Sequence, residues 1–135
     1  MTYPSKVMTV YIMGLFMTII DGTMVNVALP TMAKDFGVPT TDIEWIAVGY
    51  LLTYAAVIPA AGWLGDRFGT KRVFTAALIT FVITSLACGL SQTLDQLIAF
   101  RVLQGVGAGL ITPVGAAMLY RAYSMEDRAK AAIGV

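Results

Sequence analysis

Residues 45–65 read WIAVGYLLTYAAVIPAAGWLG, an apolar run that contains no charged side chain. A helix needs about 20 such residues to cross the hydrocarbon core of a bilayer. Inside lipid the backbone must satisfy its own hydrogen bonds, so this run predicts a membrane-spanning helix. Trp45 and Trp63 lie 18 residues apart, roughly 27 Å along a helix. We therefore expect one indole at each membrane interface, where amphipathic rings collect.

Three further apolar segments resemble this run in length. They cover residues 7–29, 73–94 and 97–120, and only Asp21 and Arg101 interrupt them. The chain of 135 residues is 58% hydrophobic and 13% charged, whereas about a quarter of the residues in soluble domains are charged. A chain of this size could not hide so much apolar surface in one soluble core. We predict an all-α integral membrane protein with four transmembrane helices.

Positive charge is distributed unequally between the two sets of connecting loops. Seven Lys and Arg residues lie before the first span, between the second and third, or after the fourth: Lys6, Arg67, Lys71, Arg72, Arg121, Arg128 and Lys130. The opposite loops contain Lys34 alone. Because positive loops stay on the cytoplasmic side, we expect a multi-pass protein of the cell membrane with a cytoplasmic N-terminus and an external loop over residues 31–44.

The composition excludes several other classes of function. The chain has no histidine, so it offers neither a bis-histidine haem site nor a histidine-rich zinc site, and a membrane redox enzyme is disfavoured. Its one cysteine, Cys88, cannot form an internal disulfide. No basic stripe indicates nucleic-acid binding. We expect no enzyme activity, no metal site, no cofactor and no nucleic-acid partner.

Asp21 is the first candidate functional residue. A carboxylate inside the membrane is costly and marks a functional site by default. Helical spacing places Gly14, Thr18, Asp21 and Val25 on one face, with the Thr18 hydroxyl within reach of the carboxyl group. We favour a functional role over the alternative, a structural hydrogen-bond anchor between helices.

Arg101 is the second candidate, and it shares a helix face with Gln104 and Gly105. A buried guanidinium needs a carboxylate, carbonyls or water. Asp21 should lie roughly 12 Å and Arg101 roughly 6 Å below the same outer surface, so the long arginine side chain could bridge the offset. The alternative is that Arg101 extends to the outer interface. Burial favours a protonated carboxyl and a nearby arginine favours the ionised form. A pair that separates and rejoins would therefore take up and release a proton.

Two glycine patterns indicate local geometry. Gly105 and Gly109 form a GxxxG face suited to close helix contact. The connection over residues 65–72 is short enough to force an antiparallel helical hairpin, and Gly69 can adopt a positive φ in its turn. Asp66 could pair with Arg67 or Lys71, or cap the following helix.

Three stretches together resemble the major facilitator superfamily. Residues 62–72, GWLGDRFGTKR, match its loop motif between helices two and three, with Thr70 where Arg or Lys is usual. Residues 97–107, LIAFRVLQGVG, match its fourth-helix motif. Residues 20–30, IDGTMVNVALP, resemble the first-helix motif of the fourteen-span drug/proton antiporters, the EmrB/QacA-like group.

The resemblance implies multidrug efflux by drug/proton antiport with alternating access. The substrate would be a small lipophilic, often cationic, compound, and the proton gradient would supply the energy without a cofactor. Asp21 and Arg101 would couple transport to protons, and Thr18, Asn26, Gln104 and Gly105 would line or support the cavity. The gating loop motif would comprise Gly62, Gly65, Asp66, Arg67, Gly69, Lys71 and Arg72.

The resemblance also implies that residues 1–135 are a partial N-terminal bundle of a longer transporter. Residues 129–135 would then begin a fifth span, and the rest of the chain would decide between 12 and 14 spans and between antiport and symport. Two alternatives come from other classes. One is a complete four-span small multidrug transporter that acts as a dimer, and the other is a membrane scaffold that transports nothing.

Overall fold

The computed structural model describes residues 2–133 and contains only helices and their connections over that range. The helices are α1 (Tyr3–Phe36), α2 (Thr40–Ile43), α3 (Trp45–Phe68), α4 (Thr70–Gly89), α5 (Leu94–Ala122) and α6 (Met125–Ile133). Four helical segments are long and apolar enough to cross a membrane, namely α1, α2 joined with α3, α4, and α5. The predicted all-α membrane class with four spanning helices is therefore confirmed.

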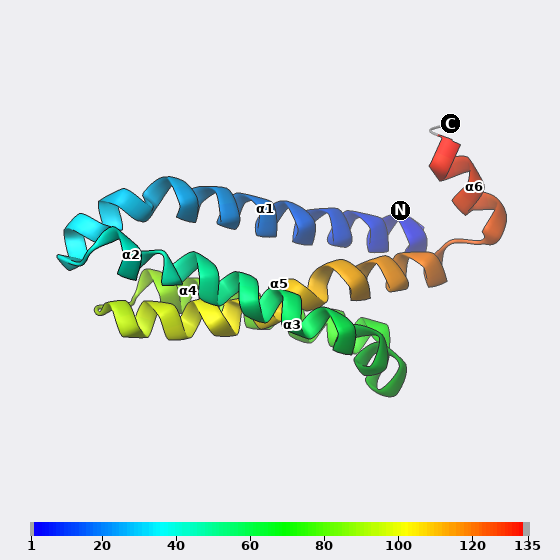
Figure 1. Ribbon diagram of the computed structural model, residues 1–135. Helices are drawn as coiled ribbons and strands as arrows, with labels where there is room; N and C mark the ends of the chain where they lie inside the picture. The colour runs from blue at the N-terminus through cyan, green and yellow to red at the C-terminus, as the bar shows by residue number, and fades with distance from the viewer. Residues whose placement is uncertain (1, 134–135) are drawn as a thin grey trace.

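The long helices lie side by side in alternating directions around α5 (Figure 1). Helix α5 contacts α1, α3 and α4. The N-terminus, the α3–α4 turn and the α5–α6 junction lie at one end of the bundle, and the α1–α2 and α4–α5 connections lie at the other (Figure 1). This arrangement places the predicted positive loops together at one end.

Glycines allow α5 to approach its neighbours on two sides. A Cβ added at Gly105 would collide with Thr53 and the Tyr50 carbonyl oxygen of α3. A Cβ added at Gly107 would lie 2.9 Å from the Ala77 carbonyl oxygen of α4. Small residues are the usual means by which membrane helices bring their backbones close. The close contact predicted for the GxxxG face is present, and α4 uses a further glycine.

Two buried apolar clusters lie along α5. The larger includes Phe74, Phe81, Ile111 and Val114. The smaller includes Ile43, Ile46 and Leu97 and lies towards the α1–α2 connection. Along α5, Arg101 lies between Leu97 of the smaller cluster and Ala108 of the larger one. A charged residue therefore separates two apolar layers.

The end of α4 differs from the sequence-based range. The third apolar segment was expected to reach residue 94, but α4 ends at Gly89 and α5 begins at Leu94. Thr93 is the N-cap of α5 and accepts a hydrogen bond from the Gln96 amide, while the Gln96 side chain accepts one from the Gln92 amide. These polar contacts, which resemble a capping box, turn the chain at Ser91, Gln92 and Thr93, which are polar but uncharged and so did not end the expected segment.

Helix α1 extends beyond the apolar segment that predicted it. It continues through Pro30 to Phe36, and its C-cap is Gly37, which has a left-handed φ of 64°. Part of the expected external loop over residues 31–44 is therefore helical. Trp45 begins α3, Trp63 lies near its end, and both indoles are exposed; their membrane depth stays a prediction. Residues 129–133 of the expected fifth span lie in α6, and residues 134–135 lie outside the described residues.

The orientation can be tested by labelling one exposed site at each end. After replacement of Cys88 and any other native cysteine, Thr41→Cys should react with a membrane-impermeant maleimide added to intact cells. Met125→Cys, at the end that carries the positive loops, should react only after the cells are opened. Both positions are exposed, so access should depend on the side of the membrane. The opposite pattern would reverse the orientation.

Candidate functional site

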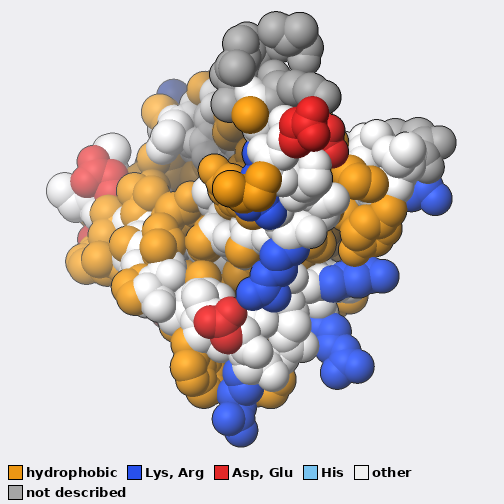
Figure 2. Space-filling view, turned by 90° about the vertical axis from the view of Figure 1, so that its right-hand side faces the viewer, with side chains coloured by type: hydrophobic (Ala, Val, Ile, Leu, Met, Phe, Trp, Pro, Cys, Tyr) orange, Lys and Arg blue, Asp and Glu red, His pale blue; other side chains and the backbone are white. Residues whose placement is uncertain are grey.

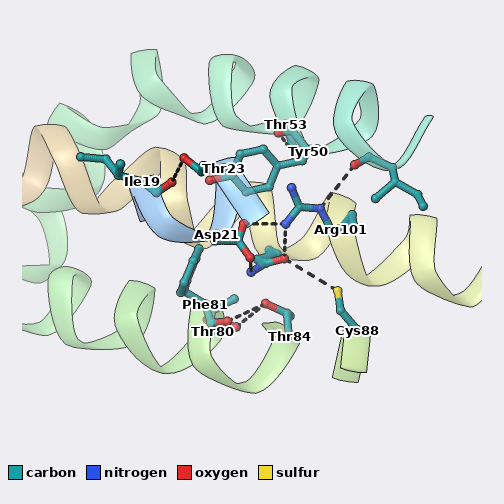
Figure 3. Close-up of polar contacts among 12 residues, drawn as sticks. Ile19, Asp21, Thr23, Tyr50, Thr53, Thr80, Phe81, Thr84, Cys88 and Arg101 are labelled. Carbon is teal, nitrogen blue, oxygen red and sulfur yellow. Dashed lines mark hydrogen bonds and ion pairs between the residues drawn. The ribbon is translucent and has the colours of Figure 1, made fainter. Parts of the chain in front are cut away.

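The centre of the site is an ion pair between α1 and α5. The Arg101 Nη1 atom lies 2.6 Å from Asp21 Oδ2. The Arg101 side chain is 3% exposed and that of Asp21 is 16% exposed. In Figure 3 the two side chains point towards each other from their helices. The contact that their depths allowed is present, and the alternative in which Arg101 reaches the outer interface is wrong.

Gln104 connects both members of the pair. Its Oε1 accepts a hydrogen bond from Arg101 Nη1 at 2.7 Å, and its Nε2 donates to Asp21 Oδ1 at 3.0 Å. Gln104 lies one helical turn after Arg101, which brings both side chains to the same face of α5. It is fully buried. The amide therefore connects the carboxylate and the guanidinium in one hydrogen-bonded network.

Helix α3 completes the surroundings of the guanidinium. Arg101 Nε donates to the Ile46 carbonyl oxygen at 3.4 Å, and the Tyr50 ring lies below the guanidinium with 4.1 Å between Cζ and the ring centroid. A desolvated cation over an aromatic face is stabilised by the ring quadrupole. Among the described residues, every buried side-chain nitrogen or oxygen has a hydrogen-bond partner. The guanidinium thus has a carboxylate, an amide oxygen, a carbonyl oxygen and an aromatic ring around it.

The Asp21 carboxyl group opens on one side to a groove between α1 and α4. The groove has a volume of about 440 Å³. Its lining is mostly apolar and includes Met17, Met24 and Met32, with Phe81 and Cys88 on the α4 side. Asp21 is the only acidic residue in that lining. The carboxyl group is therefore partly accessible from this groove, whereas the guanidinium is enclosed.

The other predicted supporting residues have different positions. The Thr18 hydroxyl donates to the Leu15 carbonyl oxygen at 2.8 Å, so the expected contact with Asp21 was wrong; a carbonyl one turn back is closer for a helical threonine. Asn26 is exposed and follows Asp21 by five residues, roughly 140° around the helix. Gly105 packs against α3. Only Gln104 of this set joins the ion pair directly.

Sequence reasoning missed the α3 and α4 contributions. Tyr50 carries no motif signal, because a tyrosine in an apolar helix usually only packs. The Ile46 partner is a backbone carbonyl, which no side-chain pattern can indicate. The Cys88 thiol donates to Gln104 Oε1 at 3.7 Å, and its link to the network depends on how α4 packs against α5.

The loop motif forms the hairpin between α3 and α4. Gly69 has a φ of 90°, as the turn required. Asp66 pairs with Arg121 at 3.2 Å, so the expected partners Arg67 and Lys71 and the expected capping role were wrong. The reason is tertiary, because the ends of α3 and α5 are neighbours although 55 residues separate the two side chains.

The remaining motif residues divide into glycines and cations. Gly65 is buried near Thr70, and Gly62 has open space around it. Arg67 lies over the Trp63 and Phe68 rings, 5.6 and 5.7 Å from their centroids. Lys71 and Arg72 are exposed in the first turn of α4.

Comparison with known proteins agrees with this arrangement of motifs. The profile described as "Major Facilitator Superfamily" matches residues 11–134. Proteins named "Putative multidrug resistance protein MdtD" from Salmonella paratyphi B and Salmonella heidelberg are 48% identical over 103 residues. The same named protein of Salmonella newport is 48% identical over 102 residues. Each match covers 76% of this chain and 22% of the relative, so the chain spans about a fifth of the length of these relatives.

A double-mutant cycle tests whether Asp21 and Arg101 depend on each other. Arg101→Ala leaves a carboxylate without its cation, and breaking a buried pair in this way costs about 3–5 kcal/mol. Asp21→Asn with Arg101→Ala removes both charges, so the double variant should melt at a higher temperature than Arg101→Ala alone. The measurement is thermal unfolding of the complete natural chain in detergent. Strictly additive effects would show that the residues are not partners.

Proposed function

This chain belongs to the major facilitator superfamily, and from that membership we propose that it is part of a proton-coupled transporter for multidrug efflux. The substrates would be small lipophilic, often cationic, compounds, exported from the cell in exchange for protons. The observation that carries the proposal is the Asp21–Arg101 ion pair inside the membrane-spanning helices. The multidrug resistance name of the relatives supports the substrate class.

The proposed cycle begins from the state in which Asp21 and Arg101 are paired. Asp21 is ionised and accepts hydrogen bonds from Arg101 and Gln104. The bond from the guanidinium joins two opposite charges and is therefore the stronger of the two. In this state the carboxylate links α1 to α5, and Arg101 is held by contacts with α1, α3 and its own helix.

The second step is proton uptake by Asp21 from the groove side. A proton added to the carboxylate gives a neutral carboxyl group, which no longer compensates the guanidinium. Arg101 keeps its positive charge and its contacts with Gln104, the Ile46 carbonyl and the Tyr50 ring. The attraction between α1 and α5 therefore weakens while the cation remains held. Release of the proton restores the pair.

The third step links this switch to alternating access. Transporters of this kind rock one helical bundle against another around a central site. We propose that Asp66 and the basic residues of the α3–α4 loop take part in the gate at the cytoplasmic end. The exposed Asp66–Arg121 pair would open cheaply, because exposed ion pairs contribute only about 0–1 kcal/mol.

Family membership disfavours both alternatives. A four-span dimeric transporter would not require the two facilitator motifs that lie outside the first helix. A scaffold would gain nothing from a buried charge pair, because apolar residues of similar volume are often at least as stable as such a pair.

Asp21→Asn should abolish proton-driven transport by the complete natural chain. The amide keeps the size and most of the hydrogen bonding of the carboxylate, but it cannot bind and release a proton. We expect uptake of ethidium into inverted vesicles to fall to the background level while expression is retained. Asp35→Asn, a charge change outside the site, should transport normally. Normal transport by Asp21→Asn would remove the coupling role.

The 135-residue chain by itself should not transport. Four spanning helices provide one partial bundle and no second bundle against which it can rock. Cells that express residues 1–135 should accumulate as much ethidium as cells with an empty vector. Efflux by this chain that stops when the proton gradient is collapsed would favour the four-span dimer instead.

A further inference from the structure

Three cations at the α3–α4 hairpin have no carboxylate partner. Arg67, Lys71 and Arg72 are exposed, and none of them forms an ion pair within the described part of the chain. The nearest acid in sequence, Asp66, pairs with Arg121 instead. Figure 2 looks onto this end of the bundle and shows Lys and Arg side chains gathered there. The hairpin therefore presents uncompensated positive charge.

Arg72 lies at the border between two apolar grooves. The first groove, of about 370 Å³, runs between α3, α4 and α5 and is lined by residues such as Phe68, Val73 and Leu110. The second follows the outer face of α4 along Thr75, Ala76 and Ile79. Arg72 and Ala76 line both grooves. One charged group is thus shared by two apolar channels.

The first groove is long enough to take part of a lipid chain. It extends along α4 from Arg72 to Thr80, which is roughly 12 Å of helix. One leaflet of the hydrocarbon core is roughly 15 Å thick. Arg72 is the one charged residue that lines the first groove, and Arg72 and Lys71 are the charged residues that line the second. Neither lining contains an acid. Charge lies at one end of the grooves and apolar surface along the rest.

We propose that this face is a binding site for an anionic phospholipid of the leaflet at this end of the bundle. The phosphate lies between Arg72 and Lys71, and the two acyl chains follow the two grooves. Basic pockets between membrane helices are known to bind anionic headgroups. Trp63 and Phe68, packed around Arg67, mark the interface where aromatic rings and headgroups meet. A zwitterionic lipid fits less well, because the site contains no carboxylate that could pair with the positive group of its headgroup. The proposal does not depend on proton coupling.

The headgroup arm of the test uses native mass spectrometry of the complete natural chain. The purified protein is mixed with equal amounts of phosphatidylglycerol and phosphatidylcholine that carry the same dioleoyl chains. We expect preferential retention of phosphatidylglycerol. A Lys or Arg near an anionic surface contributes about 1 kcal/mol, so Arg72→Gln and Lys71→Gln should each lower the preference about fivefold. Arg72→Lys should keep most of it.

The matched control is Lys34→Gln. Lys34 is exposed near the other end of α1, so its removal changes the net charge equally without touching the grooves, and the preference should stay as in the unchanged protein. Equal retention of the two lipids, or an equal loss in the Lys34 variant, would overturn the proposal. Displacement of phosphatidylglycerol by millimolar inorganic phosphate would also overturn it, because the site would then recognise a free anion.

The acyl-chain arm leaves every charge in place. Ala76→Phe fills the position shared by both grooves and should reduce retained phosphatidylglycerol severalfold. Ala56→Phe adds the same ring at an exposed position of α3 outside both grooves and should have no effect. Unchanged retention in Ala76→Phe would show that the grooves hold no lipid chain, and the proposed lipid site would then be wrong.

Discussion

A positive charge enclosed by a membrane bundle must be compensated by protein groups, and all four long helices meet at the place where this is done. Helix α5 supplies the cation and Gln104, and α1 supplies the carboxylate. Helix α3 supplies a carbonyl oxygen and an aromatic face, and the Cys88 thiol of α4 reaches Gln104. Loss of one partner of such a pair costs about 3–5 kcal/mol. One buried side chain therefore makes demands on the placement of all four long helices.

The close approach of α3 to α5 is what brings that compensation within reach. Gly105 leaves room for Thr53, whose hydroxyl donates to the Val102 carbonyl oxygen at 2.8 Å. Val102 follows Arg101, so this hydrogen bond joins the Thr53 side chain of α3 to the α5 backbone next to Arg101. A side chain at position 105 would push α3 away and would take Tyr50 and the Ile46 carbonyl with it. The motif glycine and the motif arginine thus serve one local structure.

The sequence predicted most of the features that depend on hydropathy or on local geometry. The four spans follow from apolar runs that only Asp21 and Arg101 interrupt, and the positive φ of Gly69 follows from a tight hairpin. The expected depths of Asp21 and Arg101 allowed the contact that the structure contains. It failed where a partner comes from a distant segment. Asp66 pairs across 55 residues with Arg121, and Arg101 donates to the Ile46 carbonyl oxygen of another helix. Spacing along one helix shows which face a residue occupies, but not which neighbouring helix will lie against that face.

Helix α1 is the least enclosed of the four, and this gives the ion pair a larger part in holding it. Among the described residues, only Val7 and Gly14 of α1 are buried, whereas α5 buries residues along most of its length. Beyond the ion-pair network, one further hydrogen bond joins α1 to α5 among the described residues, from the Tyr11 hydroxyl to the Thr112 carbonyl oxygen at 3.4 Å. Neutralising Asp21 would therefore remove the strongest polar link of the most loosely packed helix. In the proposed cycle, proton uptake by Asp21 would therefore weaken the contact between α1 and α5 directly, with no additional relay between the two.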